Sequence, residues 1–352
     1  MTNQSINLNP VLIAGPCSAE TEQQVLGTAK AIALKIPQAI FRAGIWKPRT
    51  RPNSFEGVGS IGLPWLRRVK EETGMQTMTE VANARHVEEC MKAGVDMLWV
   101  GARSTVSPFT VQEIAEALKG CSIPVWIKNP VNAELSLWIG AIERFDLMGV
   151  KNIGAIHRGF HSSEPRVFRN EPQWDLAMKM RSRIPGLPMI CDPSHISGNR
   201  ELIPYVARKA LDLGMDGLMI ESHQMPSKAL SDAQQQLSPD ELFDLINKLG
   251  IFASSLPVEA KDPELQKLRA SINRTDEALL DVLSQRMHIA EEIGTYKKKN
   301  KLAVLQEARW EELLRSRLEV AGAMGLNRDF VKNMYDLIHL ESIRKQTDLT
   351  GN

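Results

Sequence analysis

The amino-acid sequence predicts an α/β fold, a (β/α)8 barrel of the TIM type, followed by an all-α domain of three helices. Short apolar runs alternate with longer amphipathic segments between Pro10 and about Leu249, which is the pattern of repeated β-α units. Beyond that region the apolar residues recur at helical spacing instead. These observations predict a barrel over 1–253, a linker over 254–262 and a helical domain over 263–352.

The apolar runs have the length of strands, and each precedes a segment that can form a helix. We expect eight parallel strands at Val11–Ala14, Ala39–Ala43, Met75–Thr79, Met97–Val100, Val125–Lys128, Asn152–His157, Met189–Asp192 and Gly217–Glu221. A charged or reactive residue follows nearly every run. Because the carboxyl ends of barrel strands share one face, where barrel enzymes assemble their active sites, we expect these side chains to converge there.

The composition is that of an ordinary globular protein, with 43% apolar and 24% charged residues. Lys and Arg (43) nearly balance Asp and Glu (42), so no overall charge favours a nucleic-acid or membrane partner. The sequence MTNQSINLNP lacks a basic stretch followed by an apolar run, and no window reaches the roughly 20 apolar residues of a membrane helix. We therefore expect a cytoplasmic protein. Its four cysteines occur without a CxxC pair, and in a cytosolic chain we expect them to be free thiols.

Four side chains at separate strand ends combine sulfur, nitrogen and oxygen donors. They are Cys17, His195, Glu221 and Asp232. Taken singly, each has an ordinary interpretation, since a lone strand-end cysteine is more often a core residue and a lone histidine a satisfied hydrogen-bonding group. Together they suit a divalent transition-metal ion with an open coordination position.

Five cations follow other strands at the same predicted face. They are Arg42, Lys47, Arg103, Lys128 and Arg158. Each alone would be expected to lie in solvent or in a surface ion pair. Five that converge predict an anionic ligand, because the arginine fork matches phosphate and carboxylate groups and lysine supplies a compact charge.

Seven motifs between about residues 10 and 250 resemble those of DAHP synthases, in the same order. The motifs are AGPCSAE from Ala14, FRAGIWKPRT from Phe41, GAR from Gly101, IKNP from Ile127, HRGF from His157, CDPSH from Cys191 and IES from Ile220. The resemblance implies condensation of phosphoenolpyruvate with erythrose 4-phosphate to 3-deoxy-arabino-heptulosonate 7-phosphate and phosphate, in the shikimate pathway of aromatic amino acid biosynthesis.

The resemblance also assigns roles to the residues above. It implies that the four donors hold a divalent ion such as Mn, Fe, Co or Zn, and that the five cations bind phosphoenolpyruvate, with Lys47 and Lys128 catalytic. Arg49 and Thr50 match residues that contact erythrose 4-phosphate. No enzyme nucleophile is required, since a Lewis acid can polarise the aldehyde and cationic groups can hold both substrates.

The sister synthase that makes 3-deoxy-manno-octulosonate 8-phosphate is the alternative for the barrel. Its corresponding loop typically reads KANRS, whereas this chain has KPRT from Lys47 to Thr50, which favours the heptulosonate enzyme. Arg51 stands where DAHP synthases often carry serine, a departure that affects the geometry of this loop.

The helical domain begins with Asp262 as an N-cap and Pro263 as the first helical residue. Its first helix extends to about Asn300, and two more are expected at Gln306–Ala321 and Arg328–Gln346. A helix of ~37 residues is ~55 Å long at 1.5 Å per residue. Since the rest of the domain is too small to cover it, we expect this helix to pair with a second copy of the chain.

The segment from about Leu265 to Leu349 resembles the all-helical chorismate mutases, most clearly in LRxSIxxxDEALLxxLxxR from Leu268 to Arg286. That rearrangement of chorismate to prephenate needs only a pocket that binds a compact dianionic transition state. The resemblance implies that chorismate or prephenate is bound by Arg269, Arg286, Lys297, Gln306, Arg309, Ser342 and Gln346, of which Arg286, Lys297 and Gln346 are catalytic.

Gln306 and Trp310 stand where the best-known mutases carry acidic side chains near the substrate hydroxyl. In the family, Arg269 of the first helix is donated across an intertwined dimer, so the resemblance implies at least a homodimer. An alternative role for the helical domain is that of a dimerising, regulatory domain that binds prephenate or chorismate and inhibits the barrel allosterically.

Overall fold

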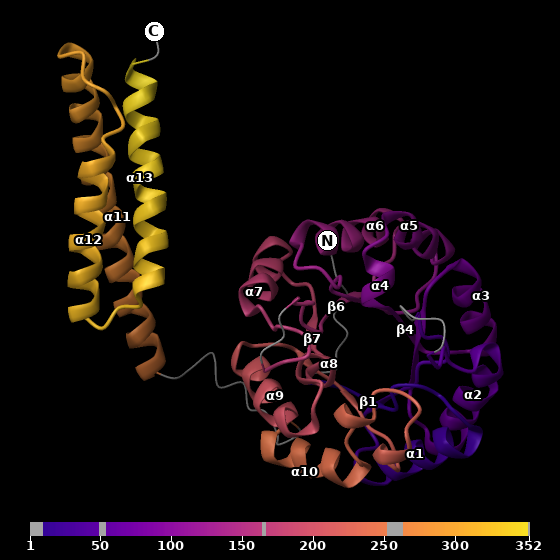
Figure 1. Ribbon diagram of the computed structural model, residues 1–352. Coiled ribbons are helices and arrows are strands. Elements are labelled where there is room, and N and C mark those ends of the chain that lie inside the picture. Colours follow the sequence, from indigo (N-terminus) through magenta and orange to yellow (C-terminus); the bar gives the residue numbers. More distant parts are fainter. Residues whose placement is uncertain (1–9, 49–53, 164–166, 252–262, 351–352) are drawn as a thin grey trace. The chain divides into compact units, whose positions relative to one another are not determined.

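The computed structural model describes residues 10–48, 54–163, 167–251 and 263–350 (Figure 1). The chain divides into two compact units, Met1–Ser254 and Ser255–Asn352. The predicted linker, 254–262, and the predicted helix cap Asp262 lie outside the described residues.

The first unit is a closed barrel of eight parallel strands that follow one another in sequence order, as predicted. The strands are β1 (Val11–Gly15), β2 (Ile40–Arg42), β3 (Thr77–Val81), β4 (Met97–Val100), β5 (Val125–Lys128), β6 (Ile153–His157), β7 (Met189–Cys191) and β8 (Gly217–Glu221). β1 closes the barrel because Ile13 pairs with Ile40 of β2 on one side and with Met219 of β8 on the other.

Helices surround the barrel, and Figure 1 shows them as an outer ring. The α-helices are α1 (Glu22–Lys35), α2 (Gly62–Thr73), α3 (Ala84–Ala93), α4 (Ala102–Thr105), α5 (Pro108–Ala117), α6 (Leu135–Leu147), α7 (Trp174–Arg183), α8 (Pro193–Ser197), α9 (Ile203–Asp212) and α10 (Pro239–Leu249). Short 3-10 turns are η1 (Gly59–Ile61), η2 (Arg200–Leu202), η3 (Pro226–Lys228) and η4 (Ala233–Gln235). The apolar faces of the α-helices and the outward side chains of the strands form one buried cluster.

A second cluster fills the inside of the barrel. It consists of Val11, Ile13, Ile40, Met78, Met97, Trp99, Trp126, Ile156, Ile190 and Met219. The indole of Trp126 has room because β6 carries Gly154, where an added Cβ would lie 2.3 Å from the Trp126 ring. The interior is therefore packed with side chains, as in other barrels of this class.

The alternation of strand side chains places charges above this interior cluster. Arg42, Glu80, Lys128 and Glu221 each follow an inward-facing core residue by two positions. Because side chains two residues apart on a strand share a face, all four are directed toward the barrel axis at its carboxyl end.

The third strand differs from its predicted position. The sequence pattern indicates Met75–Thr79, whereas β3 spans Thr77–Val81 and Glu80 belongs to the strand. The reason is that backbone pairing, and not apolarity, sets the ends of a strand. Asp96 accepts hydrogen bonds from the Thr77 backbone and hydroxyl, at 2.9 and 3.1 Å, and so fixes where the strand begins.

The second unit consists of three helices, α11 (Pro263–Lys299), α12 (Glu307–Ala323) and α13 (Arg328–Thr350), as predicted (Figure 1). α13 packs against both α11 and α12. Apolar side chains of α11 such as Ile272 (62% exposed) and Leu280 (66% exposed) remain uncovered within the single chain. No helix among the described residues is long and apolar enough to cross a membrane.

Candidate functional site

A cavity of about 620 Å³ opens at the carboxyl end of the barrel. Its lining includes Lys47, Glu80, Arg103, Lys128, Arg158, Arg169, Asn170, His195 and Asp232. Each of the strands β2 to β8 contributes a lining residue, either from its carboxyl end or from the segment that follows it, so residues far apart in the sequence meet at one mouth.

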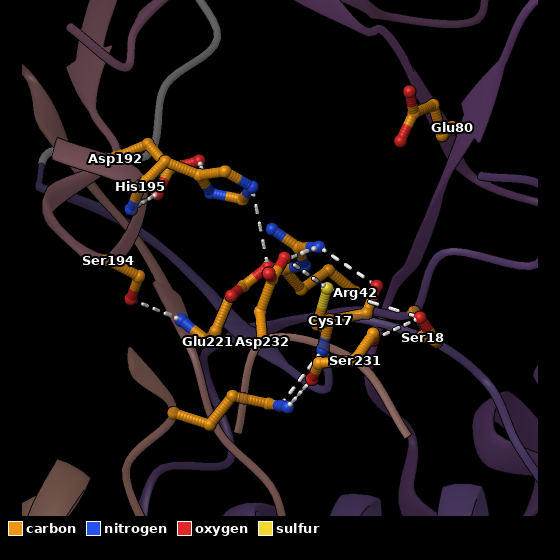
Figure 2. A network of polar contacts seen from close by, with 12 residues as sticks. Cys17, Ser18, Arg42, Glu80, Asp192, Ser194, His195, Glu221, Ser231 and Asp232 are labelled. Atoms are coloured by element: carbon orange, nitrogen blue, oxygen red, sulfur yellow. Dashed lines mark hydrogen bonds and ion pairs between the residues drawn. The ribbon is translucent and has the colours of Figure 1, made fainter. Parts of the chain in front are cut away.

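The four side chains predicted as metal ligands lie together beside this cavity. One donor atom each from Cys17, Glu221 and Asp232 lies within 4.8 Å of the others, and the Cys17 sulfur is 3.3 Å from Asp232 Oδ2. The fourth, His195, places its Nε2 3.7 Å from Glu221 Oε1. Figure 2 shows the four side chains pointing toward one another.

Local structure fixes the orientation of the histidine. Asp192 is the N-cap of α8, and its Oδ1 accepts the His195 backbone N–H at 3.1 Å, while Pro193 occupies the first helical position. The other carboxylate oxygen of Asp192 lies 2.8 Å from His195 Nδ1. The imidazole therefore presents Nε2 to the cluster, which is how outer-shell carboxylates orient ligating histidines.

The electrostatics of the cluster favour a bound cation. Burial, followed by the negative charge of Glu221, raises the pKa of the Cys17 thiol to about 12. Burial also acts to raise the pKa of Glu221, but the nearby charges of His195 and Arg42 outweigh it and hold that pKa below the usual value. Glu221 Oε1 is buried without a hydrogen-bond partner. A thiol, an imidazole and two carboxylates in this arrangement fit a divalent transition ion.

Four of the five predicted cations line the cavity, and the fifth, Arg42, lies beneath it. The Arg42 side chain is fully buried, with Nη2 3.2 Å from Glu221 Oε1 and 3.3 Å from the Cys17 carbonyl oxygen (Figure 2). Its guanidinium carbon lies 4.7 Å from the centroid of the Trp99 ring. Its Nε and Nη1 are buried without hydrogen-bond partners, which leaves two donors available to an anion.

The lining cations differ in exposure. Lys128 and Arg158 are buried, whereas Arg103 is exposed. Lys128 Nζ lies 2.7 Å from Asp192 Oδ2, yet burial outweighs this ion pair and lowers the pKa of the lysine. Burial also lowers the pKa of Arg158 to about 10, which is still above neutral pH, so its guanidinium stays charged. The guanidinium donates to Asn170 Oδ1 at 2.7 Å.

Lys47 projects into the same cavity from the loop after β2. Its Nζ lies 3.8 Å from Glu80 Oε2. Burial acts to lower the pKa of Lys47, but the charges of Cys17 and Glu80 outweigh it and raise the pKa above its usual value. Trp46, the preceding residue, stacks on the His86 ring with centroids 3.9 Å apart, which fixes the start of this loop. Arg49, Thr50 and Arg51 lie outside the described residues.

Sequence reasoning missed several polar groups of this mouth. Asp192 contacts both Lys128 and His195, and its position before Pro193 in CDPSH could have identified it as a helix cap. Trp99 lies under two of the cations. Arg169 comes from an irregular loop and Gln235 from the three-residue turn η4, and neither segment has a periodic pattern that marks the direction of a side chain.

The helical unit has a cavity of its own, of about 380 Å³. Six of the seven residues predicted to bind chorismate line it: Arg286, Lys297, Gln306, Arg309, Ser342 and Gln346. The seventh, Arg269, is exposed on α11 and does not line this cavity. Trp310 also lines it and stacks on the His339 ring, with centroids 3.9 Å apart and the planes 9° from parallel.

Two hydrogen bonds order the cationic groups of the helical cavity. Arg286 Nη1 donates to Ser342 Oγ at 2.5 Å, and Lys297 Nζ donates to the Val304 carbonyl at 2.7 Å. Burial lowers the pKa of Arg286 below its usual value. Gln346 Oε1 is buried without a partner, so the cavity presents both cations and an unpaired acceptor.

The fold and its polar mouth place the chain among the (β/α)8-barrel enzymes, with a helical domain appended. Within that class, the chain belongs to the DAHP synthetase I family, whose family model matches residues 6–250. Residues 268–347 match the chorismate mutase type II family. The two resemblances identified in the sequence are confirmed, and the chain carries two enzymatic domains.

The proteins similar to the barrel carry the names of two different aldolases. The phospho-2-dehydro-3-deoxyheptonate aldolase of Thermotoga maritima is 29% identical over 248 residues, which cover 70% of this chain and 71% of that protein. The 2-dehydro-3-deoxyphosphooctonate aldolase of Legionella pneumophila (strain Corby) is 30% identical over 258 residues, 68% of this chain and 89% of that protein. The crystal structure of the Thermotoga maritima DAHP synthase matches with a TM-score of 0.62 at 28% identity, over 69% of this chain and 68% of that one.

Proposed function

We propose that the barrel condenses phosphoenolpyruvate with erythrose 4-phosphate to give 3-deoxy-arabino-heptulosonate 7-phosphate and phosphate. The observation that carries this proposal is that buried cations surround the cluster of Cys17, His195, Glu221 and Asp232 at one mouth. Two anionic substrates repel each other, so a site for joining them must supply positive charge on several sides. Membership of the DAHP synthetase I family supports the same assignment.

In this proposal each cation has a binding role. Arg42, Lys47, Arg103, Lys128 and Arg158 bind the phosphate and carboxylate of phosphoenolpyruvate. The unpaired Nε and Nη1 of Arg42 are suited to the deepest contact, because they are already desolvated. Lys47 and Lys128 are the catalytic residues in this proposal, and the lowered pKa of Lys128 lets it exchange a proton beside Asp192 more readily than a free lysine. Arg49 and Thr50 bind the phosphate of erythrose 4-phosphate.

We propose that Cys17, His195, Glu221 and Asp232 hold the divalent ion, which when bound supplies Lewis acidity toward the aldehyde oxygen. Exhaustive chelation of the purified chain is then expected to abolish formation of the heptulosonate product. Addition of Mn²⁺, Fe²⁺, Co²⁺ or Zn²⁺ should restore it. Product formation can be followed by consumption of the enol absorbance of phosphoenolpyruvate, and undiminished turnover after chelation contradicts a metal role.

The identity of the second substrate can be tested by comparing aldose phosphates with different numbers of carbon atoms. A seven-carbon product requires a four-carbon aldose phosphate, whereas the octulosonate product of the sister synthase requires a five-carbon one, arabinose 5-phosphate. We expect kcat/KM with erythrose 4-phosphate to exceed that with arabinose 5-phosphate by at least about 100-fold, since the phosphate must reach a fixed cationic site. The reverse preference would assign the barrel to the octulosonate reaction, the name that several relatives carry.

For the helical domain we propose the rearrangement of chorismate to prephenate, with Arg286, Lys297 and Gln346 as the catalytic residues and Arg309, Ser342 and Gln306 as further ligands. Support comes from a cavity that combines three cations with the unpaired acceptor of Gln346. Purified full-length protein supplied with chorismate alone should form prephenate. Intact chorismate in the presence of an active synthase would leave these cations as binding residues only.

We further propose that the helical domains of two chains pair. The exposed apolar side chains of α11, including Ile272 and Leu280, support this, as does the exposed position of Arg269 outside its own chain's cavity. In a dimer Arg269 would complete the cavity of the partner. The same site gives the second candidate function, in which prephenate bound there inhibits the barrel as feedback control.

A further inference from the structure

Arg169 is a cation at the barrel mouth to which the proposed reaction gives no role. It lies in the segment between β6 and α7, where its side chain is half exposed. Its Nη1 lies 2.9 Å from Asp232 Oδ1 and 2.6 Å from Gln235 Oε1. Both acceptors belong to the segment that follows β8, so one guanidinium nitrogen joins two separate loops of the mouth.

The contact with Gln235 continues to a second carboxylate. The Gln235 side chain is buried, and its Nε2 donates to Glu221 Oε2 at 2.7 Å. Arg169 therefore fixes Asp232 directly and Glu221 through one amide. An amide that accepts on one side and donates on the other is fixed in a single orientation. The Gln235 side chain therefore holds Arg169 and Glu221 in a fixed arrangement.

These contacts use only one oxygen of each carboxylate. Asp232 Oδ2 is free of Arg169 and lies 3.3 Å from the Cys17 sulfur. Glu221 Oε1 is likewise not bonded to Gln235, and it lies 3.7 Å from His195 Nε2. The outer oxygens are thus held by Arg169 and Gln235. The inner oxygens lie near the Cys17 sulfur and the His195 imidazole, and Figure 2 shows these side chains pointing toward one another.

The backbone around both loops is arranged to keep this contact. Asp232 adopts a left-handed conformation, with φ at 48° and ψ at 37°, which a non-glycine residue retains only when its surroundings determine it. On the other side, the Arg169 N–H donates to the Ser197 carbonyl at 3.3 Å. Gly198 makes the close approach possible, because an added Cβ there would lie 2.4 Å from the Arg169 Cβ.

Asn170, the residue after Arg169, contacts the backbone of the proposed ligand His195. Asn170 Nδ2 donates to the His195 carbonyl at 2.7 Å, and the Asn170 N–H donates to the Ile196 carbonyl at 3.1 Å. Residues 169 and 170 together therefore contact Asp232, reach Glu221 through Gln235, and contact the backbone of His195.

We propose that Arg169 is a positioning residue of the metal site, which orients Asp232 and, through Gln235, Glu221, so that their inner oxygens face the ion. This inference rests on the proposed metal function of the cluster. The inference predicts the direction in which metal affinity changes when Arg169 is removed. The direction is informative because a guanidinium that orients the ligands of a dication also repels the dication. If orientation dominates, removing the arginine weakens metal binding; if repulsion dominates, removal strengthens it.

The test uses the full-length, metal-stripped protein and Mn²⁺ as the probe, with the dissociation constant measured by competition against a fluorescent chelator. We expect Arg169→Met to raise the dissociation constant by about 10-fold or more, the scale on which outer-shell partners act. Arg169→Lys keeps the charge but loses the planar fork, so its effect should be intermediate. Gln235→Met, which keeps the Arg169–Asp232 pair, should also weaken binding, but less than Arg169→Met.

Arg208→Met is the matched control, because that exposed arginine of α9 donates to backbone carbonyls at the α10 terminus and does not line the barrel cavity. It should leave the dissociation constant unchanged. The thermal midpoint of the metal-free protein should be the same in all variants, and KM for phosphoenolpyruvate at saturating Mn²⁺ should be unchanged in Arg169→Met.

An unchanged or lower dissociation constant in Arg169→Met would overturn the inference. So would a raised KM for phosphoenolpyruvate without a change in metal affinity, since Arg169 would then be a substrate ligand. If the wild-type protein itself binds no Mn²⁺, the proposed metal function fails, an outcome that is distinct from wild-type binding that Arg169→Met does not alter.

Discussion

Replacing Cys17 with alanine is expected to abolish synthase turnover and to weaken metal binding by more than the roughly 10–100-fold that loss of an outer-shell partner costs. The Cys17 sulfur lies within 4.8 Å of a donor atom of Glu221 and of Asp232, and it is the only soft donor among the four ligands we propose. Without it, two carboxylates and an imidazole remain, a weaker set for Mn, Fe, Co or Zn. The measurements are turnover with phosphoenolpyruvate and erythrose 4-phosphate, and metal content after dialysis.

Cys90→Ala is the matched control for this variant. Cys90 is also a buried thiol, but it lies on α3 in the cluster between the helices and the outer faces of the strands. Its loss should cost packing energy and leave metal content and turnover intact. A Cys17→Ala protein that retains one tightly bound ion per chain would contradict the assignment of Cys17 as a ligand, whatever its turnover.

The fold could be read from the sequence because its signals are local. Each strand of the barrel is a short apolar run. Repetition of the β-α unit places each strand parallel to the one before it, so the strands pair in sequence order. The strand-end charges follow from the same rule: once Ile40 and Met219 are inward, Arg42 and Glu221 must be inward too. This is why residues placed by strand register were found from the sequence.

Two further residues of the barrel mouth were not found from the sequence. Arg169 reaches the cluster from an irregular segment and Gln235 from the short 3-10 turn η4. Their direction depends on a left-handed Asp232 and on the close approach at Gly198. Neither feature leaves a periodic trace in the sequence. Arg269 shows a different limit, since it is exposed in the single chain and does not line the cavity of its own helical unit. The family motifs indicated roles for it that one chain's packing does not reveal.

Replacing Arg286 with alanine is expected to lower kcat/KM for chorismate by about 10²–10³, the cost of removing one preorganised charged donor from a site that stabilises a developing anion. Arg286 is half-buried, holds Ser342 Oγ at 2.5 Å and lines the helical cavity. Its partner Ser342 also donates to the Ile338 carbonyl at 2.7 Å, so the helix contact survives the substitution. Prephenate formation by the full-length protein is the measurement.

Arg315→Ala provides the control, because Arg315 is exposed on α12 and does not line the cavity. The Arg286→Ala protein also tests regulation, since both functions proposed for the helical domain use one cavity. If prephenate bound there inhibits the barrel, the substitution should relieve inhibition of the synthase while its turnover without prephenate stays at the wild-type rate. Loss of mutase activity with inhibition unchanged would separate the two functions and place the inhibitor site elsewhere.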